Sequence, residues 1–220
     1  MNFNNVTPVV KNLLIINIIV FLGASVLESS LGSEVINEWL AVHYPASEFF
    51  KPVQLVTYMF MHGSLMHIFF NMFGLFMFGP PVEYIWGAKR FLIYYFFTGF
   101  GALVLDFAVK YYQLNYTLLS PLEAFMITNT PMVGASGALF GILAAYGYLF
   151  PNNIIMPLFP PIPIKAKYFV IIFGAIELYS GISNMTTATS NIAHFAHLGG
   201  ALFGFLLILY WKSGGQLGRK

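Results

Sequence analysis

The sequence predicts an all-α membrane protein in which six transmembrane helices form one bundle. Hydrophobic residues make up 58% of its 220 residues and charged residues only 8%, whereas soluble domains carry roughly 25% charged residues. A helix needs roughly 20 mostly apolar residues to cross about 30 Å of hydrocarbon, and six charge-poor segments of about this length follow one another. The net charge of +2 gives no reason to expect nucleic-acid binding, and the absence of cysteine excludes disulfides and thiolate chemistry.

The six predicted spans lie between charged residues or prolines. They cover about residues 12–28, 64–84, 90–109, 134–150, 166–182 and 192–211. The charge-free stretch 52–82 is longer than one span needs, so we interpret 52–63 as an interfacial segment that leads into the second span. Pro131 precedes the fourth span and a proline-rich run at 157–163 follows it, which confines the helix to the middle. Asp106 and Lys110 are interpreted as an ion pair at the end of the third span.

Lysine and arginine residues predict the orientation of the bundle, since cytoplasmic loops are enriched in them. With a cytoplasmic N-terminus, eight of the ten basic residues lie inside, and only Lys51 and Lys110 lie outside. The inner residues are Lys11, Lys89, Arg90, Lys165, Lys167, Lys212, Arg219 and Lys220. We therefore expect both termini to be cytoplasmic and the outer side to be the other face of the membrane. The expected location is a bacterial plasma membrane, which the chain would cross several times. Residues 1–220 would form a single membrane domain with short cytoplasmic termini, no cleavable signal and no appended soluble domain.

The polar residues that are suited to catalysis are predicted to lie at one depth in the membrane. The second, fourth and sixth spans all run from outside to inside in this topology, so His67, Ser136 and His197 lie within the first turns of their helices. Asn71 follows His67 by one turn, and this i, i+4 spacing puts both side chains on one face. Buried polar groups cost free energy unless they have partners or a function. The sequence thus predicts a polar site at one depth, opening to the outer side.

These residue types are suited to nucleophilic catalysis. An imidazole within hydrogen-bond reach activates a serine hydroxyl near neutral pH, and His197 is predicted to be the base for Ser136. Two Gly-x-x-x-Gly faces predict that the helices carrying these residues touch, because glycine lets helix backbones approach closely in a membrane. The faces consist of Gly137 with Gly141 and of Gly200 with Gly204.

An oxyanion site is predicted next to the serine. Gly134 and Gly137 leave the backbone amide of Ser136 uncrowded, and at a helix start that amide is unsatisfied and positively polarised. Such a donor stabilises the negative oxygen of a tetrahedral intermediate. His67 and Asn71 would supply side-chain donors to the same oxygen. No cofactor or metal is expected for this reaction.

At these residues the sequence resembles the rhomboid intramembrane serine proteases. The matching segments are Gly134-Ala135-Ser136-Gly137, Ala196-His197-Leu198-Gly199-Gly200 with Gly204, His62-Gly63-Ser64-Leu65-Met66-His67-Ile68-Phe69-Phe70-Asn71, and Glu83-Tyr84-Ile85-Trp86-Gly87 followed by Arg90-Phe91. They occur in the family's order over roughly residues 50–212. The resemblance implies a six-helix rhomboid-like bundle and a catalytic dyad of Ser136 and His197, with His67 and Asn71 at the oxyanion. The implied substrates are single-span or other transmembrane proteins, cut within the lipid bilayer.

Two departures from the family pattern concern the surroundings of this site. Val53-Gln54 stands where the family typically carries Trp-Arg in the first outer loop. In relatives that arginine is thought to hold the loop against the glutamate that matches Glu83, so Glu83 is kept as structural support and the anchor of the loop is open. Phe140 stands where a tyrosine that stacks on the catalytic imidazole is common, and the phenyl ring is expected to stack in the same way.

Other polar residues have plainer interpretations. His194 lies one turn before His197 and is an alternative base, although packing or a hydrogen bond at the outer rim is the preferred role. Glu177 merits a functional hypothesis because acids within a membrane are rare, although a rim position that reaches water is the preferred interpretation. His62 is interpreted as structural, and His43 as a solvated loop residue.

Two other classes of function are weighed against proteolysis. An inactive, rhomboid-shaped binding module would be expected to lose Ser136 or His197. A metalloprotease or metal transporter would use the five histidines, but there is no His-Glu-x-x-His, and the spacing of His62 and His67 turns them off a common helix face. No internal repeats of the transporter kind are seen. The polar stretch 183–191 is predicted to form an outer lid near which substrate enters from the lipid.

Overall fold

Five long helices make up most of the computed structural model, which describes residues 6–157, 160–183 and 192–215. They are α1 (Pro8–Leu31), α4 (Leu65–Trp86), α5 (Ala88–Tyr116), α8 (Ala166–Ser183) and α9 (Ile192–Ser213). Each is long and apolar enough to cross a membrane, and each covers nearly the whole of its predicted span. The prediction of a helical membrane bundle is confirmed.

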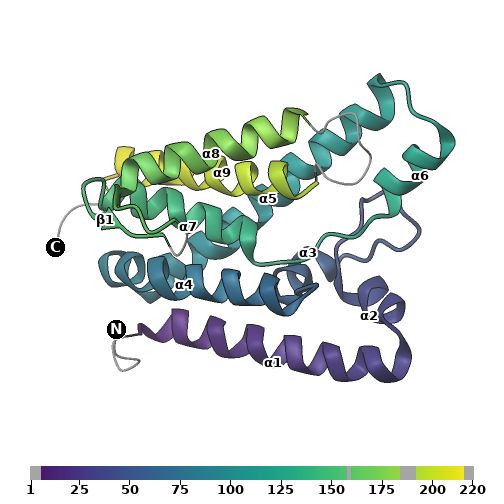
Figure 1. Cartoon of the computed structure of the whole chain (residues 1–220), viewed down its shortest axis with the longest axis horizontal. Helices are drawn as coiled ribbons and strands as arrows, with labels where there is room; N and C mark the ends of the chain where they lie inside the picture. Colours follow the sequence, from purple (N-terminus) through teal and green to yellow (C-terminus); the bar gives the residue numbers. More distant parts are fainter. Residues whose placement is uncertain (1–5, 158–159, 184–191, 216–220) are drawn as a thin grey trace.

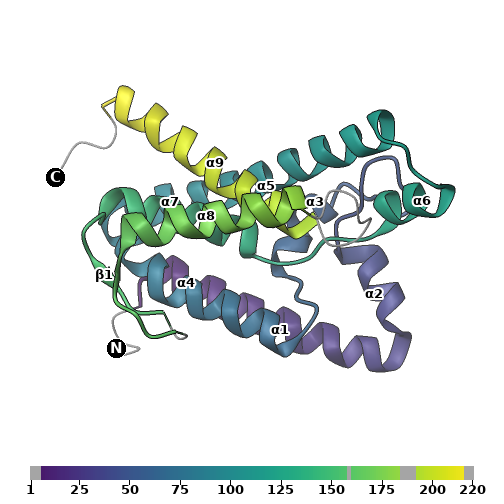
Figure 2. The same cartoon turned by 45° about the horizontal axis from the view of Figure 1, so that its top comes forward.

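The predicted fourth span is shorter than the others. It corresponds to α7 (Ser136–Leu149), which has 14 residues and is about 21 Å long at 1.5 Å per residue, whereas the hydrocarbon layer is about 30 Å thick. No residue of α7 is exposed, because α4, α5, α8 and α9 all contact this helix (Figure 2). Five helices among the described residues therefore have the length of a span, and the number six stays a prediction.

The helices α1, α4, α5, α7, α8 and α9 alternate in direction along the chain, so the start of α1 and the end of α9 lie at the same end of the bundle (Figure 1). The end of α4 and the starts of α5 and α8 lie there as well. Most of the basic residues belong to this end of the described chain: Lys11, Lys89, Arg90, Lys165, Lys167 and Lys212. Lys51 and Lys110 belong to the other end.

Short elements gather at the end of the bundle opposite to the start of α1. They are α2 (Ser33–Leu40), α3 (Gln54–Thr57), the 3₁₀ helix η2 (Tyr58–Phe60) and α6 (Pro121–Asn129) (Figure 1). An isolated bridge between Val42 and Met132 ties the segment after α2 to the segment after α6. The predicted interfacial segment 52–63 thus contains two short helical turns, and the two long loops that are predicted to be external pack on each other.

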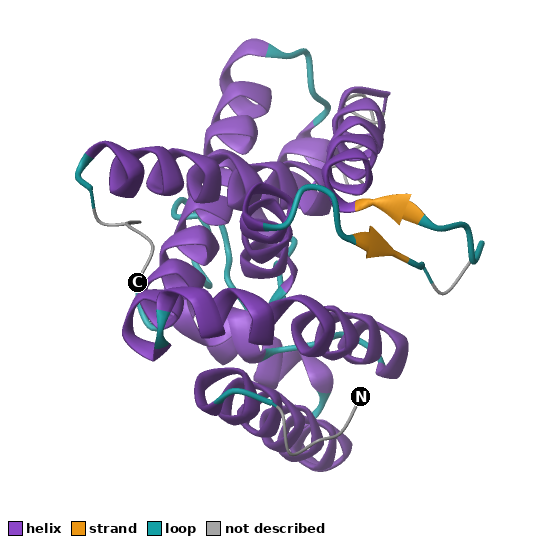
Figure 3. Cartoon of the chain, turned by 90° about the vertical axis from the view of Figure 1, so that its left-hand side faces the viewer, coloured by secondary structure: helices purple, strands orange, loops and turns teal. Residues whose placement is uncertain are grey.

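A small hairpin follows α7 at the end of the bundle where α1 begins. Strands β1 (Ile154–Ile155) and β2 (Ile164–Lys165) are antiparallel, with Ile154 opposite Lys165. They project from the helices beside the start of α8 (Figure 3). The prolines between them cannot continue a helix, so the chain reverses here in an extended conformation.

The ion pair of Asp106 and Lys110 lies inside α5 and not at its end. The helix continues for six residues beyond Lys110, to Tyr116. The two side chains are 2% exposed each, and Nζ lies 3.3 Å from Oδ2. The interpretation as an end-of-helix pair was therefore wrong. Both charged groups can stay buried because each has an opposite charge one helical turn away.

Candidate active site

Ser136 is the first residue of α7, and the preceding loop sets the position of this helix start. Gly134 has φ of +125°, which L side chains rarely adopt, and its amide donates to the carbonyl of Tyr58 at 2.9 Å. A Cβ at Gly134 would lie 2.8 Å from Nε2 of His67 and 3.6 Å from Oγ of Ser136. Gly134 therefore supplies both the backbone turn and the space between these two side chains.

Ser136 faces His197 across the contact between α7 and α9. The Oγ atom of Ser136 lies 2.8 Å from Nε2 of His197. The two helices approach closely because a Cβ on Gly200 would collide with the carbonyl group of Gly137. The phenyl ring of Phe140 stacks on the imidazole of His197, with 4.3 Å between centroids and 4° between planes. The structure thus brings together the serine and the histidine that the sequence pairs, and it contains the expected aromatic stack.

The remaining two glycines of the predicted faces contact α5. A Cβ at Gly141 would lie 2.5 Å from the Cβ of Thr98, and one at Gly204 would collide with the hydroxyl of Tyr94. That hydroxyl donates to the carbonyl of Gly141 at 2.8 Å. The glycine faces therefore bring three helices together, with α5 packed along the crossing of α7 and α9.

All four polar residues predicted for the site line one cavity. Its volume is about 290 Å³, and its walls include Ser136, His197, His67 and Asn71. Asn71 is 5% exposed and donates from Nδ2 to the carbonyl of His67 at 2.9 Å. Because these residues come from α4, α7 and α9, the cavity exists only when the three helices are packed.

The ring of His67 has a defined tautomer in this cavity. Its backbone amide donates to Oγ of Ser64, the N-cap of α4, at 3.1 Å. Its Nδ1 accepts from the amide of Gly63 at 3.4 Å. A neutral imidazole that accepts at Nδ1 carries its proton on Nε2. The Nε2 atom, which lies beside Gly134, is therefore a donor aimed into the cavity.

Glu177 lies at the two histidines of α9 and not at a water-exposed rim. Its Oε2 is 2.6 Å from Nδ1 of His194 and 3.1 Å from Nδ1 of His197, and its side chain is 14% exposed. The interpretation that Glu177 reaches water was wrong, because α8 packs against α9 with this face inward. The signals in the sequence were an acid within an apolar span and two histidines three residues apart. Pairing them required the packing of the helices.

His62 packs beside the cavity as a neutral side chain. It is 7% exposed, and its ring meets that of His67 edge to face with 5.0 Å between centroids. Burial, with a smaller effect from His67, lowers the pKa of His62 to about 4. An imidazole with this pKa is uncharged near neutral pH, so its contact with His67 is one between neutral rings.

Glu83 binds the start of α1. Its carboxylate accepts hydrogen bonds from the hydroxyl of Thr7 and from the amides of Val9, at 3.0 Å, and Val10, at 2.9 Å. A carboxylate at this position satisfies amides that have no partner within the helix and interacts favourably with the helix dipole. Glu83 thus joins α4 to α1, and the first outer loop has a different anchor.

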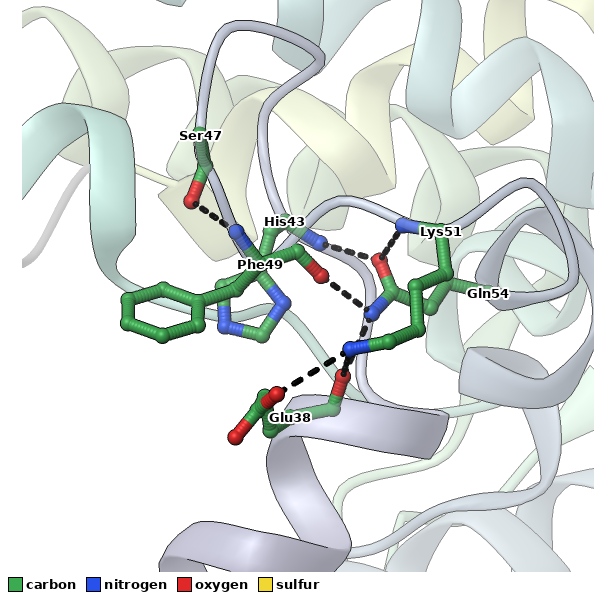
Figure 4. Close-up of polar contacts among 6 residues, drawn as sticks. All are labelled: Glu38, His43, Ser47, Phe49, Lys51 and Gln54. Carbon is green, nitrogen blue, oxygen red and sulfur yellow. Dashed lines mark hydrogen bonds and ion pairs between the residues drawn. The ribbon is translucent and has the colours of Figure 1, made fainter.

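That anchor is Gln54, whose side chain is fully buried. Its Oε1 accepts from the amides of His43 at 3.3 Å and Lys51 at 3.0 Å, and its Nε2 donates to the carbonyls of Glu38 and Phe49 at 2.8 Å each (Figure 4). Lys51 adds an ion pair to Glu38 at 3.2 Å. His43 is 4% exposed, so its interpretation as a solvated loop residue was wrong. One carboxamide holds four backbone groups of this loop.

Two further expectations concern the outer lid and the binding of a metal ion. The predicted lid, 183–191, lies outside the described residues except for Ser183. Within 6–157, 160–183 and 192–215, no three His, Cys, Asp or Glu side chains are arranged to hold a metal ion.

The fold and this cavity define a multi-pass integral membrane protein with a serine–histidine contact inside its helical bundle. A family model described as the Rhomboid domain matches residues 50–213. The chain belongs to the rhomboid family.

Several proteins are similar to the chain over most of its length. Rhomboid protease AarA of Providencia stuartii is 29% identical over 155 residues, which are 68% of this chain and 52% of that protein. Putative rhomboid protease YdcA of Bacillus subtilis is 29% identical over 156 residues, 70% and 64% of the two chains. The presenilin-associated rhomboid-like protein, mitochondrial, of Rattus norvegicus is 31% identical over 180 residues, 77% and 42% of the two chains. The chain spans about half the length of these relatives.

Proposed function

We propose that this chain is an intramembrane serine endopeptidase that hydrolyses peptide bonds in or near transmembrane segments of other membrane proteins. The observation that carries the proposal is the 2.8 Å contact between Oγ of Ser136 and Nε2 of His197 beside a cavity of about 290 Å³. The relatives named as rhomboid proteases support the same class of reaction. A binding module without activity would have no use for a serine hydroxyl held against an imidazole.

The proposed reaction begins with the neutral imidazole of His197. Its Nε2 takes the proton of the Ser136 hydroxyl while Oγ attacks the carbonyl carbon of the substrate. The tetrahedral intermediate collapses, the carbon–nitrogen bond breaks, and the proton passes from Nε2 to the leaving amine. A water molecule then gives its proton to the same nitrogen and attacks the acyl-enzyme. Breaking of the ester bond returns the proton to Ser136 and releases the carboxylate product.

Three donors are proposed for the oxyanion: the amide of Ser136, Nε2 of His67 and Nδ2 of Asn71. The amide belongs to the first turn of α7, where backbone N–H groups have no acceptor within the helix. The His67 donor follows from the proton on Nε2. One N–H of Asn71 is engaged by the carbonyl of His67, and the second is left for substrate. Donors fixed before the reaction stabilise developing charge without a reorganisation cost.

Substrate is proposed to enter from the lipid beside α8. Only Ala166, Phe169 and Gly181 are buried among the described residues of this helix, so few contacts resist its displacement. A substrate helix must unwind locally, because its own turns shield the peptide bond and occupy the carbonyl that the oxyanion donors must reach. Proteins with a single apolar span and helix-destabilising residues near one membrane surface fit this requirement.

The proposed setting is a bacterial plasma membrane, with both termini cytoplasmic and the cavity opening to the outer side. The gathering of basic residues at one end of the bundle supports this orientation. The chain contains no cysteine, so single cysteines provide clean probes. A membrane-impermeant thiol reagent on intact cells should modify Ser120→Cys and spare Ser213→Cys, and the reverse pattern would invert the topology.

Substitution of the serine tests the reaction. In detergent, wild-type protein should cut a single-span substrate at a site that mass spectrometry defines, and Ser136→Ala or His197→Ala should abolish the cut. The matched control is Ser25→Ala, because Ser25 lies in α1 and only donates to the carbonyl of Phe21 at 2.8 Å. A fluorophosphonate should label Ser136 in the wild-type protein. Full cleavage by Ser136→Ala would exclude the proposed nucleophile.

A further inference from the structure

A carboxylate lies at the second ring nitrogen of His197, the one that does not contact Ser136. The Nε2 atom of His197 lies 2.8 Å from Oγ of Ser136, and its Nδ1 lies 3.1 Å from Oε2 of Glu177. The side chains of His197 and Glu177 are largely buried, at 18% and 14% exposed, respectively. The three groups therefore form a continuous line from α7 through α9 to α8, with the imidazole in the middle.

The proposed role of His197 as the catalytic base gives a carboxylate at its Nδ1 atom a function. If Nε2 accepts the serine proton, Nδ1 must carry the ring proton in the resting state, and both nitrogens carry protons after the transfer. A carboxylate at Nδ1 selects that tautomer, orients the ring and stabilises the imidazolium. The angle of the Nδ1 contact lies outside that of a well-aligned hydrogen bond. Such contacts often tighten only when substrate is bound.

His194 is a second partner of the carboxylate. Its Nδ1 lies 2.6 Å from the same Oε2 of Glu177, and its side chain is 27% exposed. An acid within a membrane span is costly without partners, and His194 alone would supply one. A purely structural role of Glu177 needs only the contact with His194. The contact with His197 is additional to that role.

We propose that Glu177 is a positioning residue for His197, so that the catalytic dyad works as an acid–imidazole–serine line. This inference rests on the proposed protease function. Among the described residues, Glu177 is the one carboxylate at His197. The other polar groups around this ring and its cavity are Ser136 on α7, His67 and Asn71 on α4, Tyr58, and His194 on α9. Glu177 acts through the imidazole and does not touch substrate.

The test compares two substitutions of Glu177 with one of its second partner. Glu177→Gln keeps the shape of the side chain and removes the charge, Glu177→Ala removes the contact, and His194→Ala removes only the other imidazole. The measurements are kcat and KM for a single-span substrate, the rate of Ser136 labelling by a fluorophosphonate, and Tm. Glu177→Gln serves as the readout if Glu177→Ala does not fold.

Both Glu177 variants should lose kcat and labelling rate by about 10²-fold, less than the roughly 10⁴-fold seen where a serine protease loses a fully buried, well-aligned acid. KM should change by less than about twofold, and His194→Ala should keep kcat within about threefold. Wild-type kcat and labelling in Glu177→Gln would overturn the inference. So would equal kinetic losses in His194→Ala, or losses of Tm alone. Wild-type protein that is neither labelled nor active would instead show that the proposed function has failed.

Discussion

Replacing Gly134 by alanine tests the oxyanion role of His67 with a single methyl group. The new Cβ would lie 2.8 Å from Nε2 of His67, so the imidazole must move by several tenths of an ångström to reach ordinary contact. Alanine would also have to adopt φ of +125°, and holding an L residue in such a sparsely populated conformation costs roughly 1–3 kcal/mol. Displacing one oxyanion donor typically lowers kcat by about 10²–10³, or roughly 3–4 kcal/mol.

Gly87→Ala separates the two effects. Gly87 joins α4 to α5 with φ of +77°, and a Cβ there would meet nothing within 4 Å. This substitution therefore brings backbone strain of the same kind without a clash. Both variants should have a lower Tm than the wild type, and only Gly134→Ala should lose kcat.

The assay measures kcat, KM and Tm on the same detergent-solubilised preparations with one single-span substrate. KM should stay within about twofold in Gly134→Ala, because the proposed donor interacts with an oxygen charge that exists only as the intermediate forms. Wild-type kcat in Gly134→Ala would refute the placement of His67 at the oxyanion. Equal losses of kcat in both glycine variants would attribute the effect to strain and not to the donor.

Two further predictions concern the outer end of the bundle. Gln54→Ala should destabilise the first outer loop by about 2–4 kcal/mol, since four backbone groups lose their partner. The control Val53→Ala should change little, because Val53 is exposed. Hydrogen exchange of the amides in 38–54 measures both variants, and equal protection of these amides in Gln54→Ala and Val53→Ala would contradict the role of Gln54 as the anchor. Tm should fall as pH drops from about 6.5 towards 4, because burial lowers the pKa of His62 to about 4 and the unfolded chain binds the proton first. This contribution reaches about 3 kcal/mol. The fall in Tm should be smaller in His62→Gln. The remaining fall is assigned to His43, because burial also lowers the pKa of His43. Equal slopes of Tm against pH in the wild type and in His62→Gln would exclude His62 as the cause.

The long helices could be predicted from the sequence because charge depletion is a property of each segment by itself. The short elements of the outer end could not. α2 and α6 have eight and nine residues, too few for a reliable period of apolar positions, and their burial depends on the pairing of two loops distant in the sequence. The error at His43 has the same origin, because its environment is created by the side chain of Gln54.

The four residues of the candidate site could be predicted because their spacing and depth follow from the topology. The environment of Glu177 was wrongly predicted for a different reason. Its position relative to His197 depends on the rotation of α8 about its own axis, and α8 has an apolar surface on most sides, so no pattern in the sequence fixes that rotation. The contacts with His194 and His197 appear only once the helices are packed.

The shortness of α7 explains why a serine inside this bundle is available for chemistry. Ser25 lies in the body of α1, and its hydroxyl donates to the carbonyl of Phe21, four residues back, as serines in membrane helices often do. Ser136 is the first residue of its helix, so no helical carbonyl lies four residues behind it and Oγ bonds to His197 instead. The same helix start leaves the amide of Ser136 without an intrahelical acceptor. A span extended by a turn or two before Ser136 would remove both the free hydroxyl and the free amide. The late start that makes α7 a short span therefore places the proposed nucleophile and one of its proposed oxyanion donors at a single residue.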